Sequence, residues 1–439
     1  MRLPLRLTRS SFVRNTAVLM TGTFIGQVIT LIATLITGRL FAPEEFGDLT
    51  FFVAWTGVFI VIASLRYEQA IVLPENEREA VSVLIVSLLL TIIIAAICST
   101  AGLIFNDWMS EYISTDNSLF LMATSFLFVL AFGSYQALSY WAIRQKQFQR
   151  LSYSQVGRAL SVAVIQISAG IINTGAEGLI VGQVAGQVVA TALLALQIRH
   201  DQGDGIWAIP PTFADLRTAM RIYRRFPFYS APQGVFNNIT QNMPVYLLSI
   251  YFDRTVVGHY GLAYRLLSLP TQLIARAVRQ VLFQQASAVY RQRSNFARLV
   301  IKSSLGLFAL GIGPTLIIVI FGPQLFQLAL GEQWVTAGQF SQWMVLWLFA
   351  GFVATPSITV IPIIDRLRML AIWDICQFGL GSAALYLGGL SKNAHISVIT
   401  FSLVGCVFGL YLILHVYLAV KPSHLYTTID DIEDAKRDR

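Results

Sequence analysis

Long apolar stretches alternate with short polar segments along almost the whole chain. Each stretch is about as long as the ~20 residues that an α-helix needs to cross ~30 Å of hydrocarbon, and far longer than a barrel strand. We therefore predict an all-α polytopic membrane protein. The twelve predicted spans are residues 15–38, 49–70, 81–105, 118–142, 153–173, 177–198, 227–251, 255–276, 299–321, 337–362, 368–390 and 395–419.

The composition agrees with this prediction, because the chain is 55% hydrophobic and only 12% charged, with a mean hydropathy of +0.64. Soluble proteins carry about 25% charged residues. The longest interior loop runs from about Arg199 to Phe226 and is too short for a catalytic domain. The sequence also lacks a Walker-type phosphate loop and the common hydrolase and metal motifs. We expect a protein that is not an enzyme and holds no metal.

The basic residues are distributed unequally between the two sides of the predicted membrane. With the N-terminus on side one, 27 of the 31 Lys and Arg fall on that side. The four on side two are Arg39, Arg254, Arg265 and Lys392. Positive charge resists translocation, so side one is predicted to be cytoplasmic, with both termini inside. The net charge of +8 does not indicate nucleic-acid binding, because these residues are spread over loop ends.

The chain divides into two halves of six spans each. We predict an N-terminal lobe at 1–205, a C-terminal lobe at 206–420 and a disordered cytoplasmic tail at 421–439. The halves show faint similarity at an offset of 211 residues, which pairs Phe41 with Phe252 and Gly47 with Gly258. Such a repeat predicts a symmetry axis along the membrane normal and a central cavity between the lobes. A twelve-helix bundle without a repeat is the alternative.

Polar side chains recur on one face of two predicted spans. In the first span Gln27 lies on a face shared with three threonines, and in the seventh Asn237 and Gln241 are four residues apart, with Asn238 beside them. Such groups must be satisfied within the bundle or face water. We interpret them as two stripes that line a cavity and bind substrate. Hydrogen bonding between helices is the alternative.

Arginines are the most informative polar residues. Arg265 falls near the middle of the eighth span, where an arginine costs at least ~2.5 kcal/mol to insert. We predict that Arg265, Arg66, Arg39, Arg276 and Arg279 form a cationic path for an anionic ligand, since guanidinium groups offer bidentate donors to phosphate. The alternatives are an interhelical ion pair for Arg265 and ordinary cytoplasmic flanking for Arg66, Arg276 and Arg279.

Two acidic residues could titrate during transport. Glu68 lies two positions after Arg66, and residues two apart do not share a helical face, so the two are not expected to pair simply with each other. Asp374 lies near the start of the eleventh span, where helix capping or a local ion pair is the alternative interpretation. The scarcity of other intramembrane acids gives only weak support for a proton relay.

Three segments resemble a known family. RLFAPEEFG at residues 39–47, LRYEQAIVLP at 65–74 and VGHYGLA at 257–263 are similar to segments of the Wzx-type flippases of O-antigen and exopolysaccharide biosynthesis. These belong to the multidrug/oligosaccharidyl-lipid/polysaccharide exporter superfamily. The resemblance extends over 1–420, but it carries no catalytic signature.

The resemblance implies two six-helix lobes that open alternately, in the bacterial inner membrane. It implies an undecaprenyl-pyrophosphate-linked oligosaccharide as substrate, for lipopolysaccharide, exopolysaccharide or capsule, with no cofactor beyond a coupling H⁺ or Na⁺. A polysaccharide polymerase and glycosyltransferases are the implied partners. A peptidoglycan-precursor flippase, a cation-coupled drug exporter and a membrane glycan polymerase remain open as alternatives.

Overall fold

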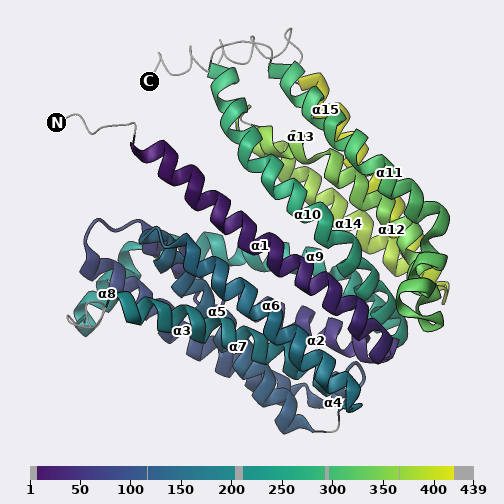
Figure 1. Ribbon diagram of the computed structural model, residues 1–439, viewed down its shortest axis with the longest axis horizontal. Coiled ribbons are helices and arrows are strands. Elements are labelled where there is room, and N and C mark those ends of the chain that lie inside the picture. Colours follow the sequence, from purple (N-terminus) through teal and green to yellow (C-terminus); the bar gives the residue numbers. More distant parts are fainter. Residues whose placement is uncertain (1–6, 116, 203–210, 292–295, 365, 420–439) are drawn as a thin grey trace. The chain divides into compact units, whose positions relative to one another are not determined.

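The computed structural model describes residues 7–115, 117–202, 211–291, 296–364 and 366–419, which form helices and no strands (Figure 1). The predicted tail at 421–439 and the predicted lobe boundary at 205 lie outside these residues. The first helices are α1 (Leu7–Leu40), α2 (Pro43–Val61), the 3₁₀-helix η1 (Tyr67–Val72), α3 (Glu77–Ile104), α4 (Asn106–Ser110), α5 (Ser118–Arg144), α6 (Phe148–Ile171) and α7 (Gly175–Gln202). Then follow α8 (Phe213–Ile222), the π-helix η2 (Phe226–Ser230), α9 (Ala231–Tyr251), α10 (Arg254–Arg291), α11 (Phe296–Leu330), η3 (Glu332–Trp334), α12 (Val335–Val353), α13 (Thr355–Val360), α14 (Leu367–Leu390) and α15 (Ala394–Ala419).

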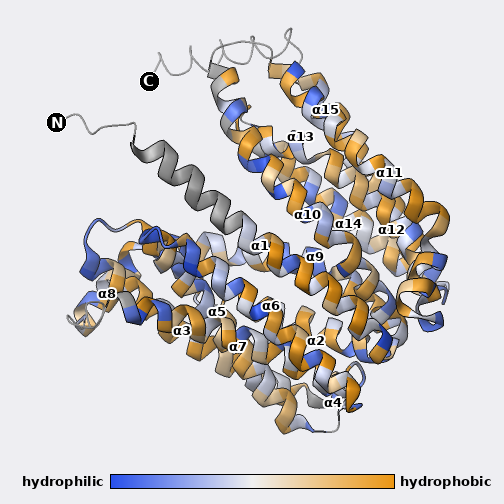
Figure 2. Cartoon of the chain, in the orientation of Figure 1, coloured by the Kyte–Doolittle hydropathy of each residue, from blue (hydrophilic) through white to orange (hydrophobic). Residues whose placement is uncertain are grey.

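The all-α membrane fold predicted from the sequence is confirmed. Among the described residues, eight helical segments are long and apolar enough to cross a membrane. Hydrophobic residues are frequent along the helices (Figure 2), and on α11 Leu305, Leu310 and Ile320 are each more than half exposed. Such side chains suit lipid rather than water. The count of twelve spans stays a prediction, because the remaining four are shorter or more polar.

The chain forms two compact units, defined by contacts. The first unit comprises Met1–Ser249 together with Asp253–Gly258, and the second comprises Ile250–Phe252 together with His259–Arg439. This division falls later than the predicted lobe boundary, because α8 and α9 pack with the first unit. On α8 the side chain of Ala219 is 2% exposed in a core built on α3 and α5, and on α9 the hydroxyl of Tyr246 donates to the carbonyl of Ala54 at 2.7 Å.

Within the first unit α6 packs between α1 and α7, and α5 packs against α3 and α7 (Figure 1). Polar side chains connect some of these helices. The hydroxyl of Thr23 donates to the Oε1 atom of Gln155 at 2.8 Å, and the amide of Gln166 donates to the carbonyl of Leu179 at 2.8 Å. These two contacts are the interhelical hydrogen bonds expected of polar groups in lipid.

Within the second unit α12 and α15 form the centre, with α11 packed on α12 and α14 packed on α15. Gly405 of α15 lies against the ring of Trp347, and the indole of Trp373 donates to the carbonyl of Phe408 at 3.2 Å. The small residue permits a close approach of two helices, and the hydrogen bond satisfies a partly buried donor.

The offset of 211 residues recurs in the helix boundaries. Helix α1 ends at Leu40 and α9 at Tyr251, while α2 begins at Pro43 and α10 at Arg254. The start of α2 meets the first residues of α10, which belong to the first unit as part of Asp253–Gly258. The hydroxyl of Thr255 donates to a carboxylate oxygen of Glu44 at 2.9 Å, and these residues are themselves 211 apart. The hydrogen bond therefore joins two equivalent positions, as contacts on a two-fold axis do.

The glycines at this crossing make reciprocal contacts. A Cβ atom on Gly47 would collide with the carbonyl oxygen of Arg254, and a Cβ atom on Gly258 would collide with the carbonyl oxygen of Pro43. Exchanging each residue for its equivalent turns one contact into the other. Only glycine permits backbones to approach so closely. The two contacts are therefore locally equivalent. The symmetry axis along the membrane normal and the central cavity stay predictions.

An ion pair adjoins this crossing. Asp48 of α2 is fully buried, and its Oδ2 atom accepts hydrogen bonds from the backbone N–H and the hydroxyl of Ser114 at 3.1 and 2.8 Å. Its Oδ1 atom lies 3.6 Å from the Nη1 atom of Arg254. One carboxylate thus connects the start of α10 with the segment before α5.

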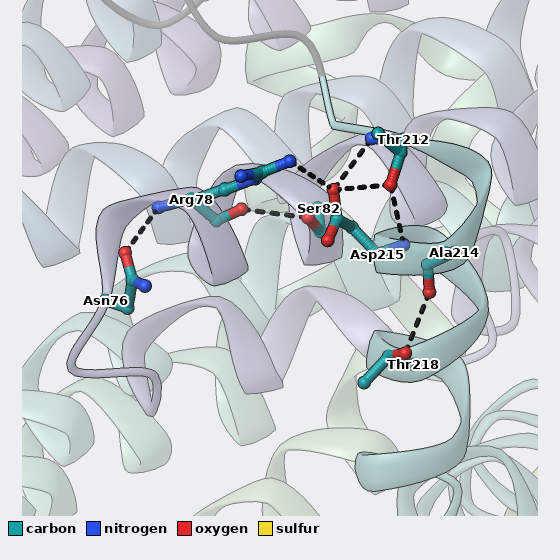
Figure 3. Close-up of polar contacts among 7 residues, drawn as sticks. All are labelled: Asn76, Arg78, Ser82, Thr212, Ala214, Asp215 and Thr218. Carbon is teal, nitrogen blue, oxygen red and sulfur yellow. Dashed lines mark hydrogen bonds and ion pairs between the residues drawn. The ribbon is translucent and has the colours of Figure 1, made fainter.

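Helix α8 is held on the first unit by polar contacts at its beginning (Figure 3). Its N-cap, Thr212, accepts a hydrogen bond from the backbone N–H of Asp215, whose carboxylate accepts from the backbone N–H of Thr212 at 2.8 Å. This is a capping box. The same carboxylate lies 2.9 Å from the Nη2 atom of Arg78, in the first turn of α3.

These contacts predict that the stability contributed by Asp215 depends on pH. The backbone N–H of Thr212, followed by the Thr212 hydroxyl and Arg78, lowers the pKa of Asp215 from its ordinary value of 3.8. A lowered folded pKa gives stability that is present above pH 3.8 and is lost as the pH falls through the folded pKa. The wild-type protein should melt higher than Asp215→Ala at pH 6, and the two midpoints should converge below pH 3.8. A difference that stays constant across this range would contradict the assignment.

Candidate anion site at the break in helix α2

The second predicted span is not one continuous helix. Helix α2 ends at Val61, and a 3₁₀-helix begins only at Tyr67. Between them Leu65 and Arg66 have φ values of 48° and 66°, in the left-handed region. Such residues cost about 1–3 kcal/mol each and cluster at functional sites. The prediction of a continuous helix over 49–70 is therefore wrong at 62–66, where the surrounding structure overrides an apolar sequence without Gly or Pro.

The break brings Arg66 and Glu68 together. The Nη1 atom of Arg66 lies 3.8 Å from the Oε1 atom of Glu68, and their side chains are 22% and 2% exposed. The hydroxyl of Ser64 donates to the same carboxylate. Helical spacing predicts that Arg66 and Glu68 do not pair, because residues two apart diverge on a regular helix. That expectation is wrong, because the backbone is not helical here.

Helix α9 borders this pair and is antiparallel to α2. Gly234 lies against the guanidinium of Arg66, since a Cβ atom there would come within 3.0 Å of its Nε atom, and Gly57 lies against the side-chain amide of Asn238. Further along α9, Tyr246 also contacts α2, through its hydrogen bond to the carbonyl of Ala54. The site thus consists of the break in α2, with its arginine and carboxylate, and the adjoining face of α9.

The electrostatics of the site favour an anion. The Nε atom of Arg66 is buried and has no hydrogen-bond partner among the described residues. The Oδ1 atom of Asn238 also lacks one among them, but it is an acceptor and suits a hydroxyl donor rather than an anion. Buried donors are usually satisfied, so a missing partner calls for an explanation. An anionic oxygen from a ligand would complete the bonding of the guanidinium, while Glu68 competes for the same cation.

The other polar residues predicted to bind substrate in the first unit are arranged differently. Asn237 and Gln241 are exposed and bond to each other, with the Gln241 amide donating to the Asn237 carbonyl oxygen at 3.0 Å. Gln27 is half-buried on α1, and its Oε1 atom has no partner among the described residues. Arg39 is exposed in the last turn of α1. Of the predicted set, the structure brings together Arg66, Glu68 and α9 at Asn238.

The remaining predicted residues belong to the second unit. Arg265 is half-buried within α10, and Arg276 and Arg279 are exposed further along the same helix. Asp374 is exposed on α14, beyond its first turn, so the interpretation of Asp374 as a capping residue is wrong. A joint cationic path through Arg66 and Arg265 stays a prediction.

Sequence reasoning missed several contacts of the first unit. Gly234 carries no functional group, and its importance lies in the space it leaves for Arg66. The guanidinium of Arg158 lies over the ring of Phe132, 5.6 Å from the centroid. Arg144 donates to the carbonyls of Ile71 and Pro74 and thereby holds the end of η1. No pattern of residue spacing in the sequence predicts these contacts.

The fold is similar to those of solved membrane transporters. The chain resembles an inward-facing multidrug resistance MATE family transporter of the MOP superfamily, with a TM-score of 0.71 and 14% identity over 92% of this chain and 96% of that one. It also resembles the lipid II flippase MurJ in an inward closed conformation, with a TM-score of 0.71 and 12% identity over 94% and 91%. At such identities the likeness concerns the fold alone.

The family follows from the sequence comparison. A family model described as polysaccharide biosynthesis protein matches residues 36–339, and the chain belongs to this family. The succinoglycan biosynthesis transport protein ExoT of Rhizobium meliloti (strain 1021) is 24% identical over 404 residues, which cover 88% of this chain and 76% of that protein. The protein is therefore a multi-span membrane exporter or flippase of polysaccharide biosynthesis and not an enzyme, as the resemblance implied.

Proposed function

We propose that the protein flips an undecaprenyl-pyrophosphate-linked oligosaccharide from the cytoplasmic to the periplasmic leaflet by alternating access. The glycan is a precursor of an O-antigen, exopolysaccharide or capsule. The observation that carries the proposal is Arg66, whose guanidinium lies in a broken helix with its Nε atom buried and without a hydrogen-bond partner in the part of the chain that the structure describes. Pyrophosphate is the group on such a substrate that a guanidinium recognises best, and amides such as Asn238 suit sugar hydroxyls.

The proposal includes a location and an orientation. The protein lies in the bacterial inner membrane with both termini in the cytoplasm, which the excess of Lys and Arg on one side supports. Arg66 then belongs to the cytoplasmic half, where a lipid-linked precursor enters. Irregular backbone at such a depth is tolerated where it is covered by protein or lines a polar space, which fits an entry site at 62–66.

The partners and the driving force belong to the same proposal. A polysaccharide polymerase and glycosyltransferases would consume and supply the substrate, and no cofactor is needed beyond a coupling H⁺ or Na⁺. Glu68 is the candidate for the coupling step, because its carboxylate is 2% exposed and adjoins Arg66. Protonation of Glu68 would free the guanidinium for the substrate. Asp374 is exposed and less suited to this role.

The proposal is tested with purified full-length protein in proteoliposomes. We expect the wild type to translocate a fluorescent polyprenyl-pyrophosphate oligosaccharide and to leave a labelled phosphatidylcholine and an organic cation unmoved. A bleaching reagent added outside the vesicles measures the translocated fraction. Failure with several glycans, beside an active control flippase, would reject the substrate class. Export of the cation instead would favour a drug exporter.

A further inference from the structure

Helix α8 and the turn after it form a two-faced surface element. One face packs on the first unit, where Leu216 and Ala219 join the core of α3 and α5. The outward side carries apolar and basic residues together. Phe213 is 82% exposed and Met220 is 42% exposed. The exposed arginines are Arg217, Arg221, Arg224 and Arg225.

The attachment of α8 fixes its depth. Its contacts reach the start of α3, where Arg78 holds Asp215 and Glu79 accepts a hydrogen bond from the Tyr223 hydroxyl at 3.0 Å. Burial, followed by Glu79, raises the pKa of Tyr223 to about 12, so this donor stays protonated. Helix α3 continues from these residues into one of the most apolar segments of the chain. Helix α8 therefore lies where a membrane span leaves the hydrocarbon.

We propose that the surface formed by α8 and the following turn, residues 213–225, binds anionic phospholipid headgroups. Charge complementarity favours this occupant, because the segment holds four exposed arginines and a single acid, which Arg78 already engages. Phe213 and Met220 beside them fit the apolar boundary below the headgroups. A basic helix with exposed apolar residues, lying at a membrane surface, is the pattern of interfacial lipid-binding helices.

The surface also adjoins the anion site. The hydroxyl of Tyr67 donates to the backbone carbonyl of Met220 at 3.0 Å, and Tyr67 directly follows Arg66. Topology alone would require only positive charge on this side of the membrane. It would not require a capped helix with one buried face, an exposed phenylalanine and a hydrogen bond to η1. The arrangement gives bound lipid a short path of contacts to the break in α2.

The test compares lipid retention by two triple variants of the full-length protein. Native mass spectrometry counts phosphatidylglycerol bound as its concentration is raised, beside phosphatidylcholine. R217Q/R221Q/R224Q removes charge from α8, and R298Q/K302Q/R368Q removes three exposed basic residues from the second unit. We expect the α8 variant alone to lose phosphatidylglycerol affinity, at least about tenfold, since one basic residue near an anionic surface contributes about fivefold.

Further measurements separate the outcomes. Phe213→Ser should weaken retention with the arginines intact, and unchanged melting midpoints should show that both triple variants are folded. Equal losses in the two triple variants would overturn the proposal, because the effect would then be one of general positive charge. Unchanged retention in the α8 variant would overturn it as well. Retention of polyprenyl pyrophosphate but not of phosphatidylglycerol would assign the surface to substrate and overturn the lipid assignment.

Discussion

Gly258→Ala is expected to destabilise the protein by about 1–3 kcal/mol, although the same change within a helix is ordinarily favourable. The added Cβ atom would collide with the backbone carbonyl of Pro43, which cannot rotate away as a side chain can. Helices α2 and α10 would have to separate, which would also lengthen the hydrogen bond between Thr255 and Glu44. Gly47→Ala should act in the same direction, because its Cβ atom would meet Arg254 in the equivalent way.

Gly306→Ala is the matched control for this prediction. It makes the same chemical change inside α11, where nothing lies within 4 Å of the added atom. There the lower entropy of the unfolded alanine chain should stabilise the protein by about 0.5–1 kcal/mol. Thermal unfolding in one detergent compares the three variants with the wild type. An unchanged midpoint for Gly258→Ala would mean that the two helices do not hold this close crossing.

The helical membrane fold could be predicted because hydrocarbon thickness imposes a minimum length on every span, and that length is visible in the sequence. The repeat left a second visible trace. The offset of 211 residues paired Gly47 with Gly258, but that pairing did not predict the close backbone contacts that the two glycines make with α10 and α2. The length of each apolar stretch can thus be read directly from consecutive residues of the sequence.

The break in α2 could not be predicted from such local signals. Leu65 and Arg66 adopt left-handed conformations without being glycine, so their backbone is set by the helices packed around them. The error over Arg66 and Glu68 followed from this, because helical spacing was applied where no helix exists. On α9 the spacing of Asn237 and Gln241 correctly placed them on one face, but only the neighbouring helix shows that Asn238 borders α2.

Arg66→Ala and Glu68→Gln are expected to change substrate affinity in opposite directions. If Arg66 holds the pyrophosphate, its loss removes charge-assisted hydrogen bonds and weakens binding by about 10- to 150-fold, equivalent to about 1.5–3 kcal/mol. Glu68→Gln removes the carboxylate that lies 3.8 Å from the guanidinium while keeping its size, so binding should be strengthened. Binding of the fluorescent lipid-linked oligosaccharide to purified variants gives both constants.

Two further variants of this pair separate the roles of Arg66 and Glu68 in substrate binding. With Arg66 absent, Glu68 has no cation to compete for, so Arg66→Ala with Glu68→Gln should bind as weakly as Arg66→Ala alone. Arg66→Lys keeps the charge but loses the planar, bidentate donors, and should fall between the wild type and the alanine variant. Arg298→Ala, at an exposed position of α11, should bind like the wild type. If Arg66→Ala and Glu68→Gln lowered the melting midpoint equally and left affinity unchanged, the pair would serve only to hold the broken helix. Opposite shifts in affinity would instead assign Arg66 to the substrate and Glu68 to its release.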